Sequence, residues 1–177
     1  MSLSAKNRQL LKDVARDAIE TVLLNRDEKH IDIPGALQEK AGAFVTLKKH
    51  GELRGCVGYT GAVMPLVETV KRVAVQAAFN DPRFSELDEE EWGDTDVEIS
   101  VLTPMRKIAA VDEIEVGTHG LYVVQGGKAG LLLPQVATEY EWDAATFLEY
   151  TCLKAGLPRD AWKEKDTERV NLKIIQN

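Results

Sequence analysis

Hydrophobic residues recur every three or four positions near the start of the chain, which is the spacing of an amphipathic helix. This stripe runs from Ser4 to about Asn25 and predicts a helix whose apolar face covers a sheet. A second stripe runs from Pro65 to Phe79. Proline is favoured in the first turn of a helix, so Pro65 marks the expected start of a second helix.

Alternation of apolar and polar residues predicts the strands. Residues 42–58 form two such runs around a short glycine-containing turn, which is typical of a β-hairpin. Residues 96–102 alternate Val97, Ile99 and Val101 with polar residues and predict a half-buried strand. A second hairpin is expected over 121–133 and a last strand over 169–176.

Shorter elements fill the intervals. The acidic segment 87–92 predicts one helical turn, 106–116 predicts short strands, and 158–165 predicts another helical turn. Asp143 is a suitable N-cap for a helix that Gly156 closes.

Composition narrows the possible functions. The 177 residues are 44% hydrophobic, which suits one domain or two lobes of one domain. A net charge of −7 argues against nucleic acid as a partner. Two cysteines fit reduced thiols, and no apolar run reaches the roughly 18 residues of a membrane span. A cytoplasmic protein with no membrane partner is therefore expected.

The segment Leu53-Arg54-Gly55-Cys56-Val57-Gly58 is the strongest candidate for a functional site. A cation and a thiol are costly in an apolar strand unless they are paired, and glycine in a strand marks a bulge or a close backbone approach. Side chains alternate along a strand, so Arg54 and Cys56 are expected to share one face. A nearby arginine would favour the reactive thiolate. In the alternative interpretation, Cys56 is a small buried hydrophobe and Arg54 a structural ion-pair partner.

Two other segments add charged groups to this candidate site. If residues 96–102 lie near the Arg54 strand in the same sheet, Glu98 could pair with Arg54. A functional cluster and a buried structural salt bridge would look the same from sequence. The loop after the second helix carries Asp81 and Arg83, and here the alternative is a turn in which Asp81 binds local backbone and Arg83 is solvated.

The sequence contains no recognisable metal-binding or cofactor-binding motif. The three histidines show no metal-ligand spacing and the two cysteines are far apart, so no metal site is predicted, and no sequence motif identifies a cofactor. His119 lies beside a turn glycine and could act as a base, although a lone histidine in a turn is more often structural. Cys56 as nucleophile, with His119 or Glu98 handling protons, would suit covalent chemistry on an acyl or carbonyl carbon.

Several ordered motifs together resemble the AMMECR-one domain family, which includes protein A of the AmmeMemoRadiSam system. The resemblance covers about residues 10–175, and the hallmark Leu-Arg-Gly-Cys-Ile-Gly stands here at 53–58 with valine for isoleucine. The other matching segments are Asp81-Pro82-Arg83-Phe84, Glu98-Ile99-Ser100-Val101-Leu102, His119-Gly120-Leu121 and Leu132-Leu133-Pro134-Gln135.

The resemblance implies an α+β fold with two mainly antiparallel sheets in a larger and a smaller lobe of one domain, the larger lobe containing both termini and flanked by helices. It also implies a cleft between the lobes that holds the hallmark segment. Possible partners implied by the family are a Memo-type dioxygenase-like protein and a radical SAM enzyme. The candidate catalytic residues are Cys56 and His119, and the candidate binding residues are Arg54, Asp81, Arg83, Glu98, Ser100 and Gln135.

Two functions follow as hypotheses. In the first, the chain is a binding module in which Arg54 and its neighbours hold an anionic or peptide-like ligand or a partner, while partner proteins do the redox chemistry. In the second, it is an enzyme with Cys56 as its nucleophile.

Overall fold

A computed structural model describes residues 3–176 of the chain, and the side chains of residues 3–170. The chain divides into two compact units. The first consists of Met1–Leu102 with Ile175–Asn177, and the second of Thr103–Ile174. The α+β fold class is confirmed, since helices and antiparallel strands occur in both units.

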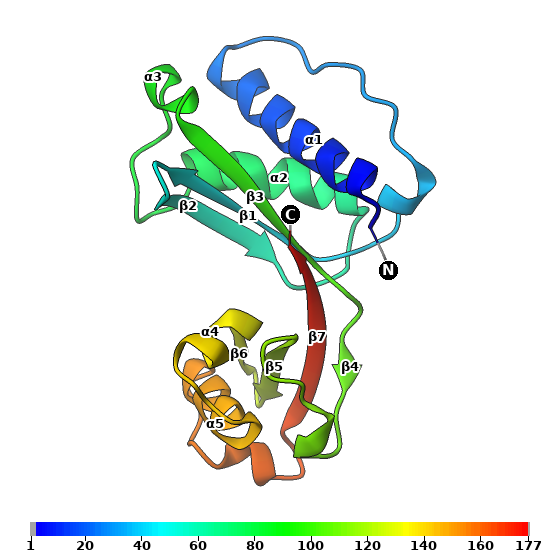
Figure 1. Cartoon of the computed structure of the whole chain (residues 1–177), viewed down its shortest axis with the longest axis vertical. Coiled ribbons are helices and arrows are strands. Elements are labelled where there is room, and N and C mark those ends of the chain that lie inside the picture. Colours follow the sequence, from blue (N-terminus) through cyan, green and yellow to red (C-terminus); the bar gives the residue numbers. More distant parts are fainter. Residues whose placement is uncertain (1–2, 177) are drawn as a thin grey trace. The chain divides into compact units, whose positions relative to one another are not determined.

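Three antiparallel strands form the sheet of the first unit: β1 (Ala43–Lys49), β2 (Glu52–Tyr59) and β3 (Thr95–Leu102). Their order is β2-β1-β3, so β1 is central and pairs with both neighbours (Figure 1). The predicted hairpin over 42–58 and the predicted strand over 96–102 are both confirmed.

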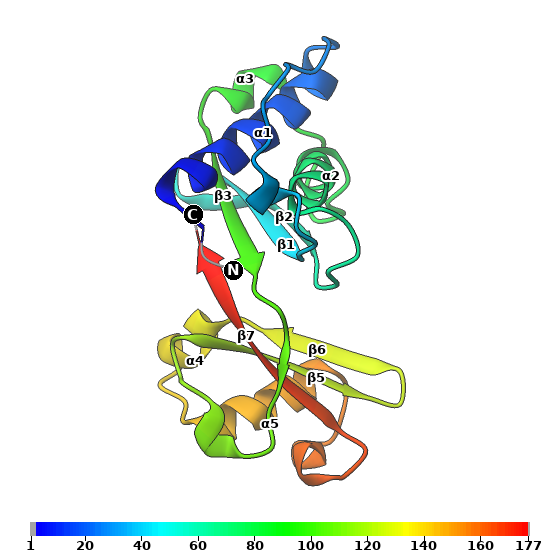
Figure 2. The same ribbon diagram turned by 90° about the vertical axis from the view of Figure 1, so that its right-hand side faces the viewer.

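Two helices cover one face of this sheet. They are α1 (Ala5–Leu23), whose N-cap Ser4 accepts a hydrogen bond from the Asn7 N–H, and α2 (Leu66–Phe79), which begins directly after Pro65. The two helices lie side by side in Figures 1 and 2. Their apolar residues pack with Val45 and Leu47 of β1 and Ile99 of β3 into one core. The amphipathic stripes in the sequence predicted both helices for this reason.

Close contact between β2 and α2 explains the first glycine of the hallmark segment. A Cβ atom at Gly55 would overlap the backbone carbonyl of Ala77 in α2. Glycine therefore allows strand and helix to approach more closely than any side chain would permit.

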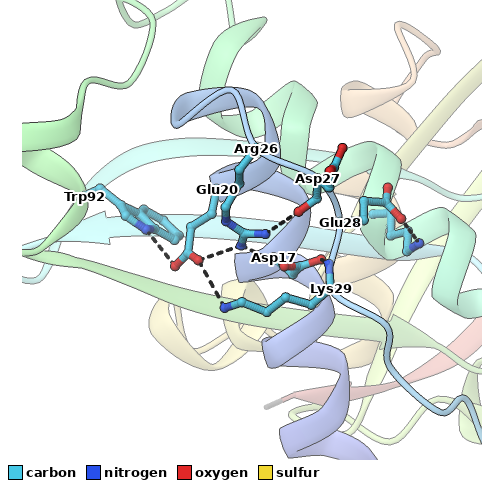
Figure 3. A network of polar contacts seen from close by, with 8 residues as sticks. Asp17, Glu20, Arg26, Asp27, Glu28, Lys29 and Trp92 are labelled. Carbon is cyan, nitrogen blue, oxygen red and sulfur yellow. Dashed lines mark hydrogen bonds and ion pairs between the residues drawn. The ribbon is translucent and has the colours of Figure 1, made fainter.

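A polar network holds the segment after α1 against the helix (Figure 3). The Arg26 Nη2 atom lies 2.7 Å from Asp17 Oδ1 and 2.8 Å from Glu20 Oε2. Glu20 also accepts a 3.1 Å hydrogen bond from the Trp92 indole, and the Lys29 N–H donates to Asp17. These carboxylates are used in internal contacts, so the network is part of the scaffold.

A short helix, α3 (Glu89–Trp92), confirms the helical turn expected over 87–92. Its N-cap is Asp88, which accepts a hydrogen bond from the Glu91 N–H. The segment from 26 to 40, by contrast, contains one 3-10 turn (Gly35–Leu37) and is otherwise irregular.

The second unit has its own antiparallel sheet. Its strands are β4 (Arg106–Lys107), β5 (His119–Gln125), β6 (Lys128–Leu132) and β7 (Glu168–Gln176). β7 pairs with β4 and with β5, and β5 pairs with β6. Of the strands expected over 106–116, only the pair Arg106–Lys107 forms within this described segment, and Val111–Glu113 is a 3-10 turn instead.

Helices α4 (Pro134–Glu139) and α5 (Ala144–Lys154) pack against this sheet. Asp143 caps α5 as predicted, because its side chain accepts a hydrogen bond from the Thr146 N–H. Phe147, Leu148 and Cys152 of α5 pack with residues of β5 into a second core. A 3-10 turn (Ala161–Lys163) confirms the helical turn expected over 158–165.

Candidate functional site

A β-bulge interrupts β2 within the hallmark segment. Leu47 is paired with Gly55 and the next residue, Lys48, with Leu53, so Arg54 is the extra residue on β2. A bulge breaks the strict alternation of side chains along a strand. The sequence-based prediction that Arg54 and Cys56 share one face assumed regular alternation between these two residues. Because Arg54 is the extra residue of the bulge, that assumption does not hold here.

Arg54 is a buried partner of Glu91. Its Nη2 atom lies 2.8 Å from Glu91 Oε2, its Nε donates to both carboxylate oxygens, and Nη2 also donates to the carbonyl of Glu86. The Arg54 side chain is 9% exposed. The guanidinium thus lies in an internal ion pair, which is the structural alternative for Arg54.

Glu98 is not the partner of Arg54, which corrects the pairing suggested from the sequence. β3 is separated from β2 by β1, so side chains of β2 and β3 on one face are about 10 Å apart. Glu98 instead pairs with Lys48 of the neighbouring strand, at 2.8 Å. The Lys48 and Glu98 side chains are 36% and 49% exposed, so solvent screens the pair and it contributes little to stability.

Electrostatics at Glu91 follow from its two cationic neighbours. The hydrogen bond from Arg54 and a further one from Lys49 lower the pKa of Glu91 to about 2, against the opposing effect of burial. Glu91 is therefore ionised at neutral pH and stays in the ion pair.

Cys56 lies on the face of the sheet opposite α1 and α2. Thr46 is its cross-strand neighbour, and the Thr46 hydroxyl donates a 3.3 Å hydrogen bond to the Cys56 sulfur. On the other side of Thr46, in the same register, is Glu98. Cys56 is partly exposed, so it is not a fully buried hydrophobe.

The Asp81/Arg83 loop clamps the backbone of Cys56 at the edge of the sheet. Asp81 Oδ2 accepts a 2.9 Å hydrogen bond from the Cys56 N–H, and Arg83 Nη2 donates a 3.2 Å bond to the Cys56 carbonyl. These two side chains supply the partners that a further strand would otherwise offer to the edge of β2. The sequence did not reveal this role.

Asp81 and Arg83 also bind each other. Arg83 donates from Nε to Oδ1 at 2.9 Å and from Nη2 to Oδ2 at 2.7 Å. This bond from Arg83, together with the N–H of Cys56, holds the pKa of Asp81 far below its usual range. Asp81 is buried, whereas the Arg83 side chain is 54% exposed, so Arg83 still presents a guanidinium surface to solvent.

The other candidate residues are distributed over both units. Ser100 is partly exposed on β3, opposite Phe44 of β1. His119 begins β5 in the second unit, and its Nδ1 accepts a hydrogen bond from the Glu115 N–H. Gln135 belongs to the first turn of α4, also in the second unit.

Two pockets of the first unit are lined by residues other than Cys56. One of about 390 Å³ is lined by residues of α1 and by Lys29, His30 and Ile31. Another of about 580 Å³ lies on α1 and α2 and includes Tyr59 at the end of β2. Neither is lined by Cys56 or Arg83.

Among residues 3–176, no group of three or more His, Cys, Asp or Glu residues is placed so that it could hold a metal ion. In that same range no helix has both the length and the apolar character needed to cross a bilayer.

Sequence reasoning missed two residues that define the surroundings of Arg54 and Cys56. Glu91 lies in the acidic segment 87–92, where the sequence predicts a helical turn but no partner for Arg54. Thr46 was interpreted as a residue of an ordinary β run. Its position opposite Cys56 follows from the hairpin register and could have been found by pairing outward from the turn.

The fold and this site define a class: α+β proteins of two units, each with an antiparallel sheet packed against helices, and with a clamped cysteine on an edge strand. The chain belongs to the AMMECR1 family, whose model matches residues 12–173. The resemblance noted in the hallmark segment is thereby confirmed.

Relatives agree with this assignment. The chain is 45% identical over 175 residues to a protein of Methanothermobacter thermautotrophicus, covering 93% of this chain and 90% of that protein. It is 48% identical over 151 residues to a protein of Aquifex aeolicus, covering 79% and 77%. A crystal structure of an uncharacterized protein, PH0010 from Pyrococcus horikoshii, matches with a TM-score of 0.87 and 39% identity, covering 98% of this chain and 92% of that one.

Proposed function

We propose that this protein is a binding module, and that the sheet face carrying Cys56 takes a peptide-like or anionic group of a partner protein. The observation that carries the proposal is the environment of the Cys56 thiol. Within residues 3–170, its hydrogen-bond partner is the Thr46 hydroxyl, and no carboxylate or imidazole is bonded to it. A cysteine nucleophile is normally activated by such a base.

Arg83 is the cation that this proposal assigns to the ligand. Arg54 is buried in its pair with Glu91, whereas the Arg83 side chain is 54% exposed beside the Cys56 carbonyl. Asp81 holds the Arg83 guanidinium in position through two hydrogen bonds, which reduces the entropy lost when a ligand binds. A carboxylate or peptide carbonyl bound to Arg83 would lie beside the backbone of Cys56, to whose carbonyl Arg83 donates.

The partners proposed are those that family resemblance implies, a Memo-type dioxygenase-like protein and a radical SAM enzyme. In this scheme they carry out the redox chemistry of a modification pathway, and this chain presents or holds a substrate. The proposed site residues of the first unit are Arg83, Asp81 and Cys56, with Glu98 and Ser100 on the same sheet. His119 and Gln135 belong to the second unit, and their roles as a base and as a binding residue stay predictions.

The test is association of this protein with each purified partner, measured by isothermal titration calorimetry. Arg83→Ala is expected to weaken binding about tenfold or more, since it removes a charge-assisted hydrogen bond. Cys56→Ser keeps a small polar group at this position and is expected to change the affinity far less than Arg83→Ala does. Lys154→Ala, which removes an exposed cation of α5, is the control. Binding that Arg83→Ala leaves unchanged would refute the assignment of Arg83.

A second candidate function, an enzyme with Cys56 as nucleophile, draws on one observation. The thiol is partly exposed while its backbone is held on the open edge by Asp81 and Arg83, an arrangement that would fix a nucleophile in place. Alkylation by iodoacetamide at neutral pH separates the two functions. Slow alkylation of Cys56 supports the binding module, and rapid alkylation of Cys56 together with loss of pathway turnover in Cys56→Ser supports the enzyme.

A further inference from the structure

Three aromatic rings form a stack on the second unit, outside the site described above. The rings of Tyr140 and Trp142 are 5.0 Å apart between centroids and inclined by 17°. Trp142 and Tyr150 follow at 4.1 Å and 10°. Such near-parallel stacking of three rings produces a polarisable platform that ends at Tyr140 on one side and at Tyr150 on the other.

The backbone between α4 and α5 builds this platform. The Trp142 N–H donates to the Ala137 carbonyl at 2.8 Å and the Glu141 N–H to the Thr138 carbonyl at 3.3 Å, which is the hydrogen-bond pattern of a Schellman cap. Glu141 has a φ of 54°, in the left-handed region. The cap reverses the chain so that Tyr140 and Trp142, two residues apart, come to lie ring against ring.

The inner part of the stack is anchored and the outer part is open. Trp142 packs against the second core, and Tyr150 belongs to α5. Tyr140 is 65% exposed, although one face of its ring rests on Trp142. A large exposed aromatic ring that is held in a fixed orientation loses little entropy on binding and is typical of an interaction site.

An arginine of this chain already occupies the Tyr150 end. The guanidinium carbon of Arg159 lies 5.0 Å from the centroid of the Tyr150 ring, and Arg159 Nη1 lies 3.4 Å from Glu149 Oε2. The aromatic face and the carboxylate thus bind the guanidinium together. The stack therefore already binds one guanidinium, from within the chain itself.

The Tyr140 end has the same components without the arginine. Glu139 and Glu141 flank Tyr140 in the sequence, and both are exposed. Within residues 3–170, neither carboxylate has an ion-pair partner. We propose that Tyr140, with Glu139 and Glu141, binds an arginine side chain of a partner protein, in the arrangement that Arg159 adopts at Tyr150. This surface goes beyond the proposed site at Cys56 and does not depend on it.

Charge decides between an arginine and other groups that stack on aromatic rings. The base of a nucleotide would bring its phosphate near two carboxylates, on a chain whose net charge is −7. A guanidinium can instead stack on the Tyr140 ring and at the same time be attracted by the two carboxylates. Its flat shape suits stacking better than the compact ammonium group of lysine does.

The experiment titrates the full chain with N-acetyl-arginine amide and follows the indole N–H resonance of Trp142 by NMR. The lysine and citrulline amides are compared at equal ionic strength, because citrulline keeps the shape of arginine without its charge. Arginine is expected to shift the Trp142 resonance in a saturable way, at a concentration about threefold lower than lysine, and citrulline to shift it least. The indole N–H resonance of Trp142 is assigned as the one that disappears in Trp142→Phe.

Variants identify the surface. Tyr140→Ala should abolish the arginine-dependent shift, Tyr140→Phe should keep it, and Glu139→Gln with Glu141→Gln should weaken binding about threefold or more. Asp112→Asn, which removes an exposed charge elsewhere on the second unit, is the matched control and should have no effect. The proposal is overturned if arginine causes no shift, if citrulline or a single-stranded oligonucleotide binds as well as arginine, or if Tyr140→Ala retains the response.

Discussion

Arg54 and Glu91 form a buried ion pair in which Nη2 and Oε2 are 2.8 Å apart and the two side chains are 9% and 21% exposed. The pair joins the bulge of β2 to the short helix before β3. Arg54 additionally lies 5.9 Å from the centroid of the Phe84 ring. These contacts make Arg54 a structural residue of the hallmark segment. Arg83, which contacts the backbone of Cys56 in the same segment, is the arginine that remains exposed.

Removing Arg54 should therefore destabilise the fold. Arg54→Ala leaves Glu91 partly buried without its main partner, and the expected loss is about 3 to 5 kcal/mol in the free energy of unfolding. Lys48→Ala breaks the exposed pair with Glu98 and should cost no more than about 1 kcal/mol. Urea denaturation of both variants measures the difference. Equal stabilities would show that Arg54 does not act through its ion pair.

The same pair predicts a dependence of stability on acid. The pKa of Glu91 is about 2 in the folded protein against its ordinary 4.5, so between these values the unfolded chain binds more protons. The contribution of Glu91 is complete above about pH 4.5 and is lost as the pH falls towards 2. Glu91→Gln should flatten the stability profile in this window. Glu90→Gln, which removes an exposed carboxylate without touching Arg54, is the control, and a profile unchanged by Glu91→Gln would contradict the prediction.

The clamp on Cys56 can be observed by hydrogen exchange. Asp81→Ala removes the acceptor of the Cys56 N–H and should both speed exchange of that amide and cost about 2 to 3 kcal/mol of stability. Arg83→Ala leaves this acceptor in place, so exchange at Cys56 should change far less. If the two variants exchange at the same rate, Asp81 is not the group that protects the edge strand.

Close packing of β2 on α2 predicts a strong effect at one glycine. Gly55→Ala would force the strand away from the Ala77 carbonyl and should cost roughly 1 to 3 kcal/mol or more. Gly93 makes a matched control, since it has helical dihedral angles and no atom within 4 Å of an added Cβ. Gly93→Ala should be neutral or stabilise by up to about 1 kcal/mol. Thermal or urea denaturation distinguishes the two, and a tolerated Gly55→Ala would exclude the close approach.

Relief of backbone strain is expected at the cap of α4. Glu141 occupies the left-handed position of the Schellman motif, where Gly156 stands in the corresponding cap of α5. Glu141→Gly should stabilise the fold by about 1 kcal/mol, because a side chain is disfavoured in this conformation. Gly156→Ala, the opposite change, should destabilise it. Denaturant midpoints measure both, and a less stable Glu141→Gly variant would argue against strain at this position.

Local patterns in the sequence determined the elements. The periodic stripes predicted α1 and α2, the alternation predicted the strands, and Asp143 predicted the start of α5, because each depends on neighbours within a few residues. The hallmark segment also identified the hairpin, the glycine at a close approach and the family. For the same reason the sequence could indicate a bulge at 53–58 but not which residue would be displaced.

Tertiary structure decided which side chains meet. Arg54 binds Glu91, 37 residues later, rather than Glu98, and Cys56 is held by Asp81 and Arg83 from the far end of α2. Which residues contact Arg54 and Cys56 depends on the strand order, on the one-residue bulge in β2 and on the path of the loop after α2, which carries Asp81 and Arg83. All three are set by packing between distant segments, which no local period in the sequence records.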